Sequence, residues 1–251
     1  MTDDGTWAAP LARLGAATLG ECGARTMPPR IRPVWPGATV AAPAYPVRCT
    51  PGDNLAVHVA VAQAPAGSVL VVDVGDVGDR GYWGEVLTTG ALARGLGGLV
   101  IDGGVRDVAA LESLGFPVFA RTVALRGATK VARGAVGSPV VVAGTAVDPG
   151  DWVVGDVDGV VVVPGARLAE VAGGGYVNPH SHPTHEFYYV LRGRGAMTVG
   201  DEDRNIAQGD LVYIPPDVVH SLRPATDHAP IHCFCFAIGV KGAGKIDYTN
   251  N

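Results

Sequence analysis

The sequence predicts two domains of different fold class, an α/β domain over residues 1–170 and an all-β jelly-roll barrel over residues 171–251. Strand and helix signals alternate in the first part, as is typical of layered α/β folds. After the glycine run at 173–175, helix signals disappear and short strands follow one another. Six of the seven histidines lie between positions 180 and 232, which gives the second domain a chemistry of its own.

The secondary-structure elements of the first domain are predicted from its apolar runs and from the Gly and Pro residues that separate them. Short buried strands are predicted at 68–73, at 98–102 and from Val118 onward. Helices are predicted at 84–95, 107–114 and 167–171, the second of them ending before Gly115 and Pro117. The glycine run that follows the last helix is the expected hinge between the domains.

The second domain is expected to consist of short antiparallel strands. They are predicted at 187–191, 196–199, 211–214 and 231–238, separated by Gly, Pro or Asp turns. Cys233 and Cys235 should be neighbours on one face of the last strand. The four cysteines show no CxxC pairing, and the acidic start of the chain lacks the features of a signal peptide, so we expect a reduced, cytoplasmic setting.

Composition argues against several classes of partner. The net charge of −5 provides no basic surface for nucleic acid or an anionic membrane. No uncharged apolar run reaches the roughly 18 residues that a membrane span requires. The chain is nevertheless 47% hydrophobic, enough to build real cores. A small-molecule substrate is therefore expected, with no nucleic-acid and no membrane partner.

The histidine cluster has the spacing of a metal site. His180 and His182 are two residues apart, which on a strand directs both imidazoles to one face. Glu186 opens the next strand, and His220 follows a strand whose end is fixed by two prolines. Three imidazoles and one carboxylate suit Fe, Mn, Ni, Co or Zn. Four ligands leave one or two positions open for a substrate on a metal that prefers five or six.

These residues resemble the two sequence motifs of the cupin family. The matching positions are Gly174, His180, His182, Glu186 and Gly193 in the first motif, and Gly209, Pro215 and His220 in the second. Asp217 and Pro224 depart from it, since the family usually has glycine at the first of these positions and often asparagine at the second. The resemblance implies a jelly-roll barrel with a bound metal. Retention of the residues without metal, or a purely structural ion, are the alternatives.

The other histidines of this region are expected outside the ligand set. His185 has the wrong strand parity for a ligand and should lie at the surface. His228 lies in a polar loop and should be solvated, whereas His232 is expected to pack in the core.

A second candidate site lies in the first domain. The segment Asp102–Asp107 follows a buried strand and opens a helix, which puts Arg106 and Asp107 at the carboxyl end of a strand, where α/β proteins bind ligands. Arginine can clamp a carboxylate, and aspartate can hold Mg²⁺ or Mn²⁺. The segment Gly84, Glu85, Val86 and Leu87 starts a helix whose N–H groups can receive an anion. Together these parts predict a 2-oxo acid site in which the C3–C4 bond is cleaved through an enolate, by retro-aldol cleavage or decarboxylation.

Residues from about 14 to 164 resemble the RraA-like family. The resemblance rests on segments 17–20, 36–40, 52–55, 83–88, 102–107 and 155–160. Its enzymatic members are class II 4-hydroxy-4-methyl-2-oxoglutarate aldolases and oxaloacetate decarboxylases. It implies that Asp107 is the metal ligand, Arg106 the substrate clamp and Gly84–Leu87 the pyruvate cradle, while Glu85 or Asp102 positions a catalytic water.

The family also includes a regulator that binds a ribonuclease and has no aldolase activity. The intact Asp-Gly-x-x-Arg-Asp turn favours the enzyme, although Asp102 and Arg106 could instead form an internal salt bridge. Family aldolases usually extend into a longer C-terminal helix, whose glutamate completes the site of the neighbouring subunit. Here only Glu170 lies nearby and a cupin follows, which weakens the case for aldol cleavage more than that for decarboxylation.

Three functional hypotheses remain open at this stage. The chain could be a bifunctional enzyme whose cupin acts on a related small acid, or an enzyme with one active domain. It could also be a regulatory protein whose cupin senses a metabolite. Both families favour homo-oligomers, so a trimer or hexamer is expected.

Overall fold

The computed structural model describes residues 7–171 and 175–238. Within it the chain divides into two compact units, residues 1–164 and 165–251, each with its own core. The predicted boundary was residue 170, but strand β13 (Leu168–Val171) pairs with β20 (Ile231–Ile238) of the second unit. The helix predicted at 167–171 is therefore wrong, because pairing with β20 satisfies this backbone as a strand. Most of the predicted glycine hinge lies outside the described residues.

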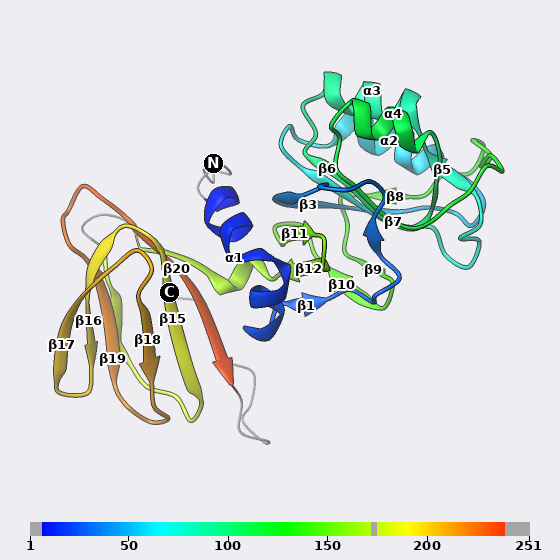
Figure 1. Cartoon of the computed structure of the whole chain (residues 1–251). Helices are drawn as coiled ribbons and strands as arrows, with labels where there is room; N and C mark the ends of the chain where they lie inside the picture. The colour runs from blue at the N-terminus through cyan, green and yellow to red at the C-terminus, as the bar shows by residue number, and fades with distance from the viewer. Residues whose placement is uncertain (1–6, 172–174, 239–251) are drawn as a thin grey trace. The chain divides into compact units, whose positions relative to one another are not determined.

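The first unit is built on one large mixed sheet with strand order β1-β12-β11-β3-β4-β6-β7-β2 (Figure 1). Strands β3, β4, β6 and β7 pair in parallel, as expected for an α/β layer, and the remaining strands of this path pair antiparallel. The strands are β1 (Arg25–Thr26), β2 (Arg32–Pro33), β3 (Val40–Arg48), β4 (Val69–Asp73), β5 (Gly81–Trp83), β6 (Gly98–Val105), β7 (Val118–Val123), β8 (Ala135–Val136), β9 (Val140–Val142), β10 (Thr145–Val147), β11 (Trp152–Asp156) and β12 (Gly159–Val163).

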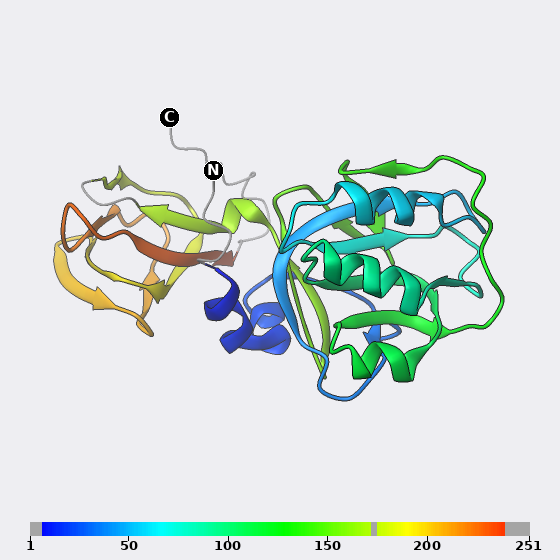
Figure 2. The ribbon, with the colours of Figure 1, turned by 90° about the horizontal axis from the view of Figure 1, so that it is seen from above.

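Helices α2 (Leu55–Gln63), α3 (Glu85–Ala93) and α4 (Val108–Ser113) lie together on one face of this sheet (Figures 1 and 2). Helix α1 (Ala8–Glu21) packs on β11, β12 and β3. The predicted helices at 84–95 and 107–114 are confirmed as α3 and α4. Strand β6 is longer than predicted and runs to Val105, because its pairing with β5 and β7 continues through Gly104. The turn expected over 102–107 is thus reduced to Arg106 and Asp107.

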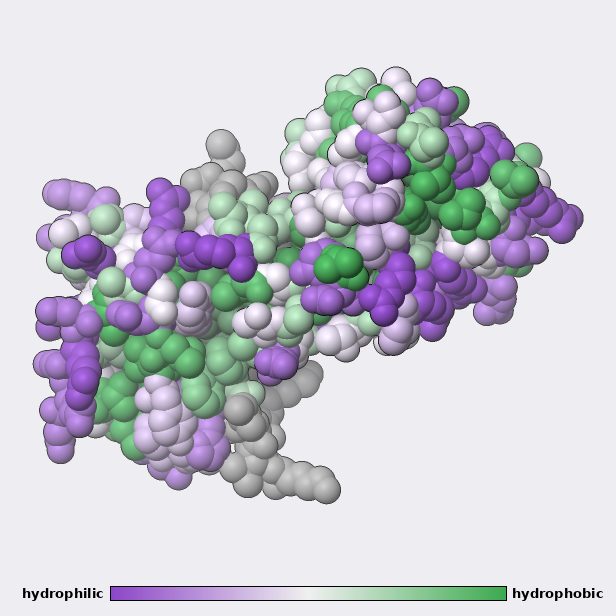
Figure 3. Space-filling model, in the orientation of Figure 1, coloured by the Kyte–Doolittle hydropathy of each residue, from purple (hydrophilic) through white to green (hydrophobic). Residues whose placement is uncertain are grey.

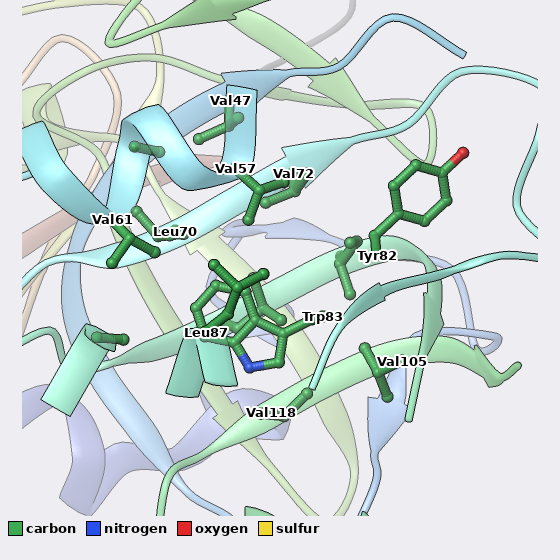
Figure 4. Packing of buried hydrophobic residues seen from close by; sticks show 14 of the residues in the cluster. Val47, Val57, Val61, Leu70, Val72, Tyr82, Trp83, Leu87, Val105 and Val118 are labelled. Carbon is green, nitrogen blue, oxygen red and sulfur yellow. The ribbon is translucent and has the colours of Figure 1, made fainter. Parts of the chain in front are cut away.

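The parallel strands are buried on both faces. Along β4, Leu70 and Val72 pack under the helices, while Val69 and Val71 face a second cluster on the other side of the sheet. This explains why β4 begins with four apolar residues, Val69 to Val72, and why β6 has the apolar run Leu99 to Ile101, since neither face meets water there. Under the helices, Leu87 and Trp83 lie among valines and leucines of α2 and the sheet (Figure 4). The start of α3 is thereby anchored to the core.

The second unit consists of two four-stranded antiparallel sheets, ordered β13-β20-β15-β18 and β14-β19-β16-β17 (Figure 1). A 3₁₀ turn, η1 (Gly165–Arg167), precedes β13. Besides β13 and β20, the strands of this unit are β14 (Val177–His180), β15 (His185–Arg192), β16 (Arg194–Val199), β17 (Glu202–Ala207), β18 (Leu211–Ile214) and β19 (His220–Pro224). Buried apolar residues of both sheets, including Cys233 and Cys235 of β20, form one core between them. The predicted jelly-roll class is confirmed.

Strand β15 shows the alternation that defines the inside and the outside of this barrel. Glu186, Tyr188 and Val190 are buried, whereas His185 and Phe187 are half-buried on the outer face. His185 donates or accepts a 2.7 Å hydrogen bond with Tyr213 on β18, consistent with its predicted surface position. Hydrophobic residues gather over β15 and β18 on this outer face (Figure 3). No helix in residues 7–171 and 175–238 is long and apolar enough to cross a membrane.

Candidate functional site

A pocket of about 270 Å³ lies where β5 meets α3 and β6 meets α4 in the first unit. Of the predicted site residues, Gly84, Val86, Leu87, Arg106 and Asp107 line it. The lining is completed by Asn54, His58, Gly81, Tyr82, Trp83, Gly127, Ala128 and Lys130. The structure therefore brings the two predicted segments, 84–87 and 106–107, to one cavity.

Asp107 occupies an unusual backbone conformation at this junction. Its φ of 60° and ψ of 36° are left-handed, and it is the residue before helix α4. Such a conformation costs about 1 kcal/mol or more for a residue other than glycine, and Asp and Asn tolerate it best. Its Oδ2 accepts a hydrogen bond of 3.1 Å from the Glu85 backbone N–H and lies 3.8 Å from Arg106 Nε. The carboxylate is thus held between the start of α3 and the arginine.

The N-terminus of α3 is arranged to receive an anion. The N-cap residue, Gly84, has no side chain with which to cap the helix, and the first N–H groups of an α-helix have no intrahelical acceptor. The Glu85 N–H is taken by Asp107, while Val86 and Leu87 line the pocket. Behind them the Trp83 indole donates a 2.7 Å hydrogen bond to Thr88 Oγ1, which locks the first turn to β5. The Glu85 side chain is exposed and does not line the cavity.

Gly84 is required at this junction by close packing rather than by its φ. A Cβ atom at this position would overlap Asp107 Oδ2 and lie 3.2 Å from Arg106 Cγ. The glycine therefore allows the Arg106–Asp107 turn to approach the start of α3.

Asp102 lies apart from the pocket, contrary to the role that the family resemblance implies for it. It is buried on β6, and its carboxylate accepts hydrogen bonds from Arg30 at 3.1 and 3.0 Å and from Arg121 at 2.7 Å. Burial alone would raise the pKa of Asp102, but these two arginines outweigh it and lower the pKa. The structure thus agrees better with the alternative in which Asp102 forms an internal salt bridge, but its partners are Arg30 and Arg121 and not Arg106. Asp102 is 6% exposed, and both of its carboxylate oxygens accept hydrogen bonds from these arginines.

Sequence reasoning missed Asn54, His58 and Lys130, which also line the pocket. Asn54 precedes α2 and His58 lies one turn further on, so their i, i+4 spacing would have signalled a shared face had a helix been predicted there. Asn54 Nδ2 donates to the Tyr82 carbonyl oxygen at 2.9 Å. Burial lowers the pKa of His58, and the nearby Lys130 ammonium lowers it further.

The four predicted cupin ligands converge in the second unit. One ligand atom from each of His180, His182, Glu186 and His220 lies within 4.8 Å of the others. Glu186 Oε2 is 2.8 Å from His182 Nε2 and 3.0 Å from His220 Nε2. Strand β14 ends at His180, so His182 reaches the cluster from the loop that follows and not from the strand expected. The Asp217 N–H holds this loop by donating to the His182 carbonyl oxygen at 2.8 Å.

The histidine rings are oriented by bonds to their far nitrogens. His180 Nδ1 donates to the Asn178 carbonyl at 2.8 Å, and His220 Nδ1 donates to the Val218 carbonyl at 3.1 Å. Nδ1 of His182 is hydrogen-bonded to Thr184 Oγ1 at 2.8 Å. For His180 and His220 the carbonyl partners select the tautomer with a free Nε2 lone pair, which is the form that binds metals.

The donor set fits a transition metal. His220 Nε2 is buried and makes no hydrogen bond of good geometry, although it lies 3.0 Å from Glu186 Oε2, and Glu186 is 1% exposed. Burial would raise the pKa of Glu186, yet its contacts with His220 and His182 lower it, so the carboxylate is ionised. Buried groups of this kind are costly unless a cation binds them. Asp217, which departs from the family's glycine, adopts a φ of 62° and so keeps the left-handed turn.

Asp107 differs from the cupin cluster as a candidate metal ligand. Among residues 7–171 and 175–238, it is not part of any group of three or more candidate ligands. Mg²⁺ commonly binds through one or two carboxylates and completes its octahedron with water and substrate oxygens. A single half-exposed carboxylate beside a pocket therefore suits Mg²⁺ better than it suits a metal ion that needs all of its ligands from the protein.

Comparisons with known proteins agree with this division of the chain. The RraA-like (Aldolase/RraA) family model matches residues 11–162, and the cupin domain model matches residues 167–237. A protein of Halalkalibacterium halodurans named "Putative 4-hydroxy-4-methyl-2-oxoglutarate aldolase" is 37% identical over 134 residues, 53% of this chain and 64% of that protein. A protein of the same name from Burkholderia multivorans is 36% identical over 150 residues, 60% of this chain and 88% of that protein.

A solved structure extends the likeness to the fold. RraAS2 of Streptomyces coelicolor, an unusual member of the RNase ES inhibitor RraA protein family, has a TM-score of 0.58 and 29% identity. The match covers 65% of this chain and 88% of that one. The match thus covers less than two thirds of the length of the Halalkalibacterium halodurans protein. It covers most of the length of the Burkholderia multivorans protein and of RraAS2. The chain therefore belongs to the RraA-like family and carries a C-terminal cupin domain.

Proposed function

We propose that the first unit is a metal-dependent carbon–carbon lyase that cleaves a 2-oxo acid through a pyruvate-type enolate. The observation that carries this is the convergence on one pocket of Arg106, Asp107 and the first turn of α3, in which Val86 and Leu87 follow the Glu85 N–H that Asp107 accepts. The names of the aldolase relatives support a lyase as well. Asp102, held by two arginines, is left out of the proposed machinery.

In this proposal, Arg106 and the α3 N-terminus bind the substrate. The Arg106 guanidinium holds the carboxylate, and the N–H groups of Val86 and Leu87 face the keto oxygen, where negative charge develops as the C3–C4 bond breaks. Mg²⁺ or Mn²⁺ held by Asp107 would supply a Lewis acid that draws electrons from C3. In decarboxylation, the electron pair of the C3–C4 bond passes to C3 and the keto oxygen, CO₂ leaves, and a proton from water completes pyruvate.

Retro-aldol cleavage shares the enolate but needs an additional proton transfer. The 4-hydroxyl must lose its proton as the C3–C4 bond breaks. Glu170, the only candidate for a C-terminal glutamate, lies on β13 opposite His232 of the cupin strand β20. We therefore expect oxaloacetate decarboxylation to be the more robust activity.

The test is pyruvate release from oxaloacetate and from 4-hydroxy-4-methyl-2-oxoglutarate, with and without Mg²⁺. We expect Mg²⁺-dependent release that Arg106→Ala and Asp107→Asn each lower at least a hundredfold. Asparagine is the control for backbone geometry, because it tolerates the left-handed φ that Asp107 adopts. If no 2-oxo acid is turned over with Mg²⁺, the chain is instead a regulatory protein whose cupin senses a metabolite.

For the second unit we propose a transition-metal centre of Fe, Mn, Ni, Co or Zn that binds or transforms a related small acid. The support is the four-residue cluster with its oriented histidines and the buried His220 Nε2. If His182→Ala leaves every catalytic step on such acids intact, the cupin is a binding domain and the protein is not bifunctional.

We also propose a homo-oligomer, a trimer or hexamer, in which the face around the lyase pocket is covered. Val86, which lines the pocket, is 83% exposed, and Leu125 and Val131 on the segment around Gly127 and Lys130 are each 84% exposed. Exposed apolar side chains that gather around a pocket commonly mark an interface. Light scattering tests this, and a monomer at micromolar concentration would contradict it.

A further inference from the structure

One residue of the cupin cluster does not lie on a strand. His180 ends β14, Glu186 lies on β15 and His220 begins β19, whereas His182 lies on the connection between β14 and β15. Ladder hydrogen bonds fix the backbone of a strand residue, and a residue on a connection has none of these. The position of the His182 ring therefore depends on other contacts.

Two contacts hold His182, one at its backbone and one at its ring. The Asp217 N–H donates to the His182 carbonyl oxygen at 2.8 Å. His182 Nδ1 lies 2.8 Å from Thr184 Oγ1, and Thr184 is 1% exposed. A buried side-chain hydroxyl thus supplies the hydrogen bond on the side of the ring that faces away from the cluster.

The other two histidines of the cluster are held in a different way. In His180 and in His220, Nδ1 lies against the backbone carbonyl oxygen two residues earlier in the chain. A carbonyl only accepts hydrogen bonds and is present whatever the side chain, whereas a hydroxyl can accept or donate. For His182 Nε2 to bind a cation, Nδ1 must carry the ring hydrogen and Thr184 Oγ1 must accept it. The orientation of His182 is therefore open to change by a single side-chain substitution.

We infer that Thr184 is the positioning residue of the cupin metal centre. Its hydroxyl accepts the hydrogen of His182 Nδ1 and so holds Nε2 at the cluster, where Nε2 lies 2.8 Å from Glu186 Oε2. This inference rests on the transition-metal centre proposed for the second unit. Partners of this kind commonly change metal affinity tenfold to a hundredfold. Thr184 thus sets the affinity of the centre through His182.

Zn²⁺ binding by the full chain, measured in competition with a chromophoric chelator, tests the inference without any turnover. Thr184→Val removes the hydroxyl and keeps the β-branched shape, so we expect the Zn²⁺ affinity to fall at least tenfold. Thr184→Ser restores the hydroxyl and should restore most of the affinity. Thr198→Val is the matched control, because it removes a hydroxyl that donates to Asp203 in the same barrel, outside the cluster.

NMR of ¹⁵N-labelled histidines separates positioning from packing. In the Zn²⁺ form of the natural chain and of Thr184→Ser, the His182 ring should carry its hydrogen on Nδ1 with Nε2 bound to the ion. In Thr184→Val this signal should be lost, while those of His180 and His220 persist. Thr184→Ala serves the same purpose if the valine variant does not fold.

Unchanged Zn²⁺ affinity without the Thr184 hydroxyl, or an equal fall in Thr198→Val, overturns the inference and leaves the metal centre standing. A fall that Thr184→Ser does not reverse would assign Thr184 a packing role and overturns it as well. If the natural chain binds none of Fe, Mn, Ni, Co and Zn, the proposed metal centre is rejected together with the inference. The two failures are thus distinguished by the natural chain alone.

Discussion

Two buried carboxylates of the first unit show how residues of one type take different roles. Asp102 is neutralised by the side chains of Arg30 and Arg121, whereas Asp53 is satisfied by backbone N–H groups and one hydroxyl. Breaking a buried ion pair leaves its partners uncompensated and costs more than the pair itself contributes. Asp102 therefore acts through the stability of the sheet around β6, while Asp53 acts through the segment that carries Lys130.

Asp53 gives this unit a predictable response to acid. Burial by itself raises the pKa of Asp53, but the bonds from Val131, Leu55, Thr129 and Ala132 outweigh it and lower the pKa to about 2. A carboxyl in an unfolded chain titrates near pH 3.9. Because the folded-state pKa is the lower one, the stabilisation is complete above about pH 4 and is lost as the pH falls towards 2.

We therefore predict that Asp53→Asn flattens the acid dependence of the first unit. Urea unfolding of the natural chain should show the midpoint falling between pH 5 and pH 3, and the variant should show a smaller fall. Asp76→Asn, which changes an exposed carboxylate, should behave like the natural chain. An equal fall in Asp53→Asn would mean that other carboxylates dominate the acid response.

At the scale of elements, the lyase pocket depends on two strand-to-helix junctions that meet. The start of α3 and the turn before α4 touch through the bond from the Glu85 N–H to Asp107 and through the close packing at Gly84. The sequence predicted both helices and the residues of both junctions, because apolar runs and Gly breaks are local signals. It did not predict the contribution of 52–58 and 127–130, since the bonds of Asp53 join segments 76 to 79 residues apart.

Gly84→Ala tests this junction. The added Cβ would overlap Asp107 Oδ2, so we expect Asp107 to move and Mg²⁺-dependent pyruvate release to fall at least tenfold. Gly90→Ala in the same helix is the control: its Cβ would meet Val61 Cγ1 at 3.5 Å, an ordinary contact. That variant should keep its activity and gain up to about 1 kcal/mol in the free energy of unfolding, from helix propensity. Equal activity in the two variants would contradict the role given to Gly84.

For the whole molecule, the sequence foresaw that the four predicted cupin ligands lie together, but it did not foresee the arginine partners of Asp102. The four cupin ligands follow from a motif whose spacing encodes strand geometry, so a local pattern was sufficient to find them. The partners of Asp102 are 72 and 19 residues away on other elements, and nothing in the turn sequence reveals them. The helix wrongly predicted at 167–171 failed for the same reason, because its partner strand lies more than 60 residues further along the chain.

The two candidate metal sites lie in separate cores, and this makes their chemistry separable. The cluster around Glu186 belongs to the barrel core, whereas Asp107 adjoins the core under α2, α3 and α4. We predict that His182→Gln loses the tightly bound transition metal, measured by elemental analysis, and keeps Mg²⁺-dependent pyruvate release within about twofold. Asp107→Asn should keep the tightly bound transition metal and lose Mg²⁺-dependent pyruvate release. Energetic coupling between two sites requires an element with two arrangements that both sites bias. Loss of pyruvate release in His182→Gln would therefore show that the barrel metal takes part in the lyase step or controls it.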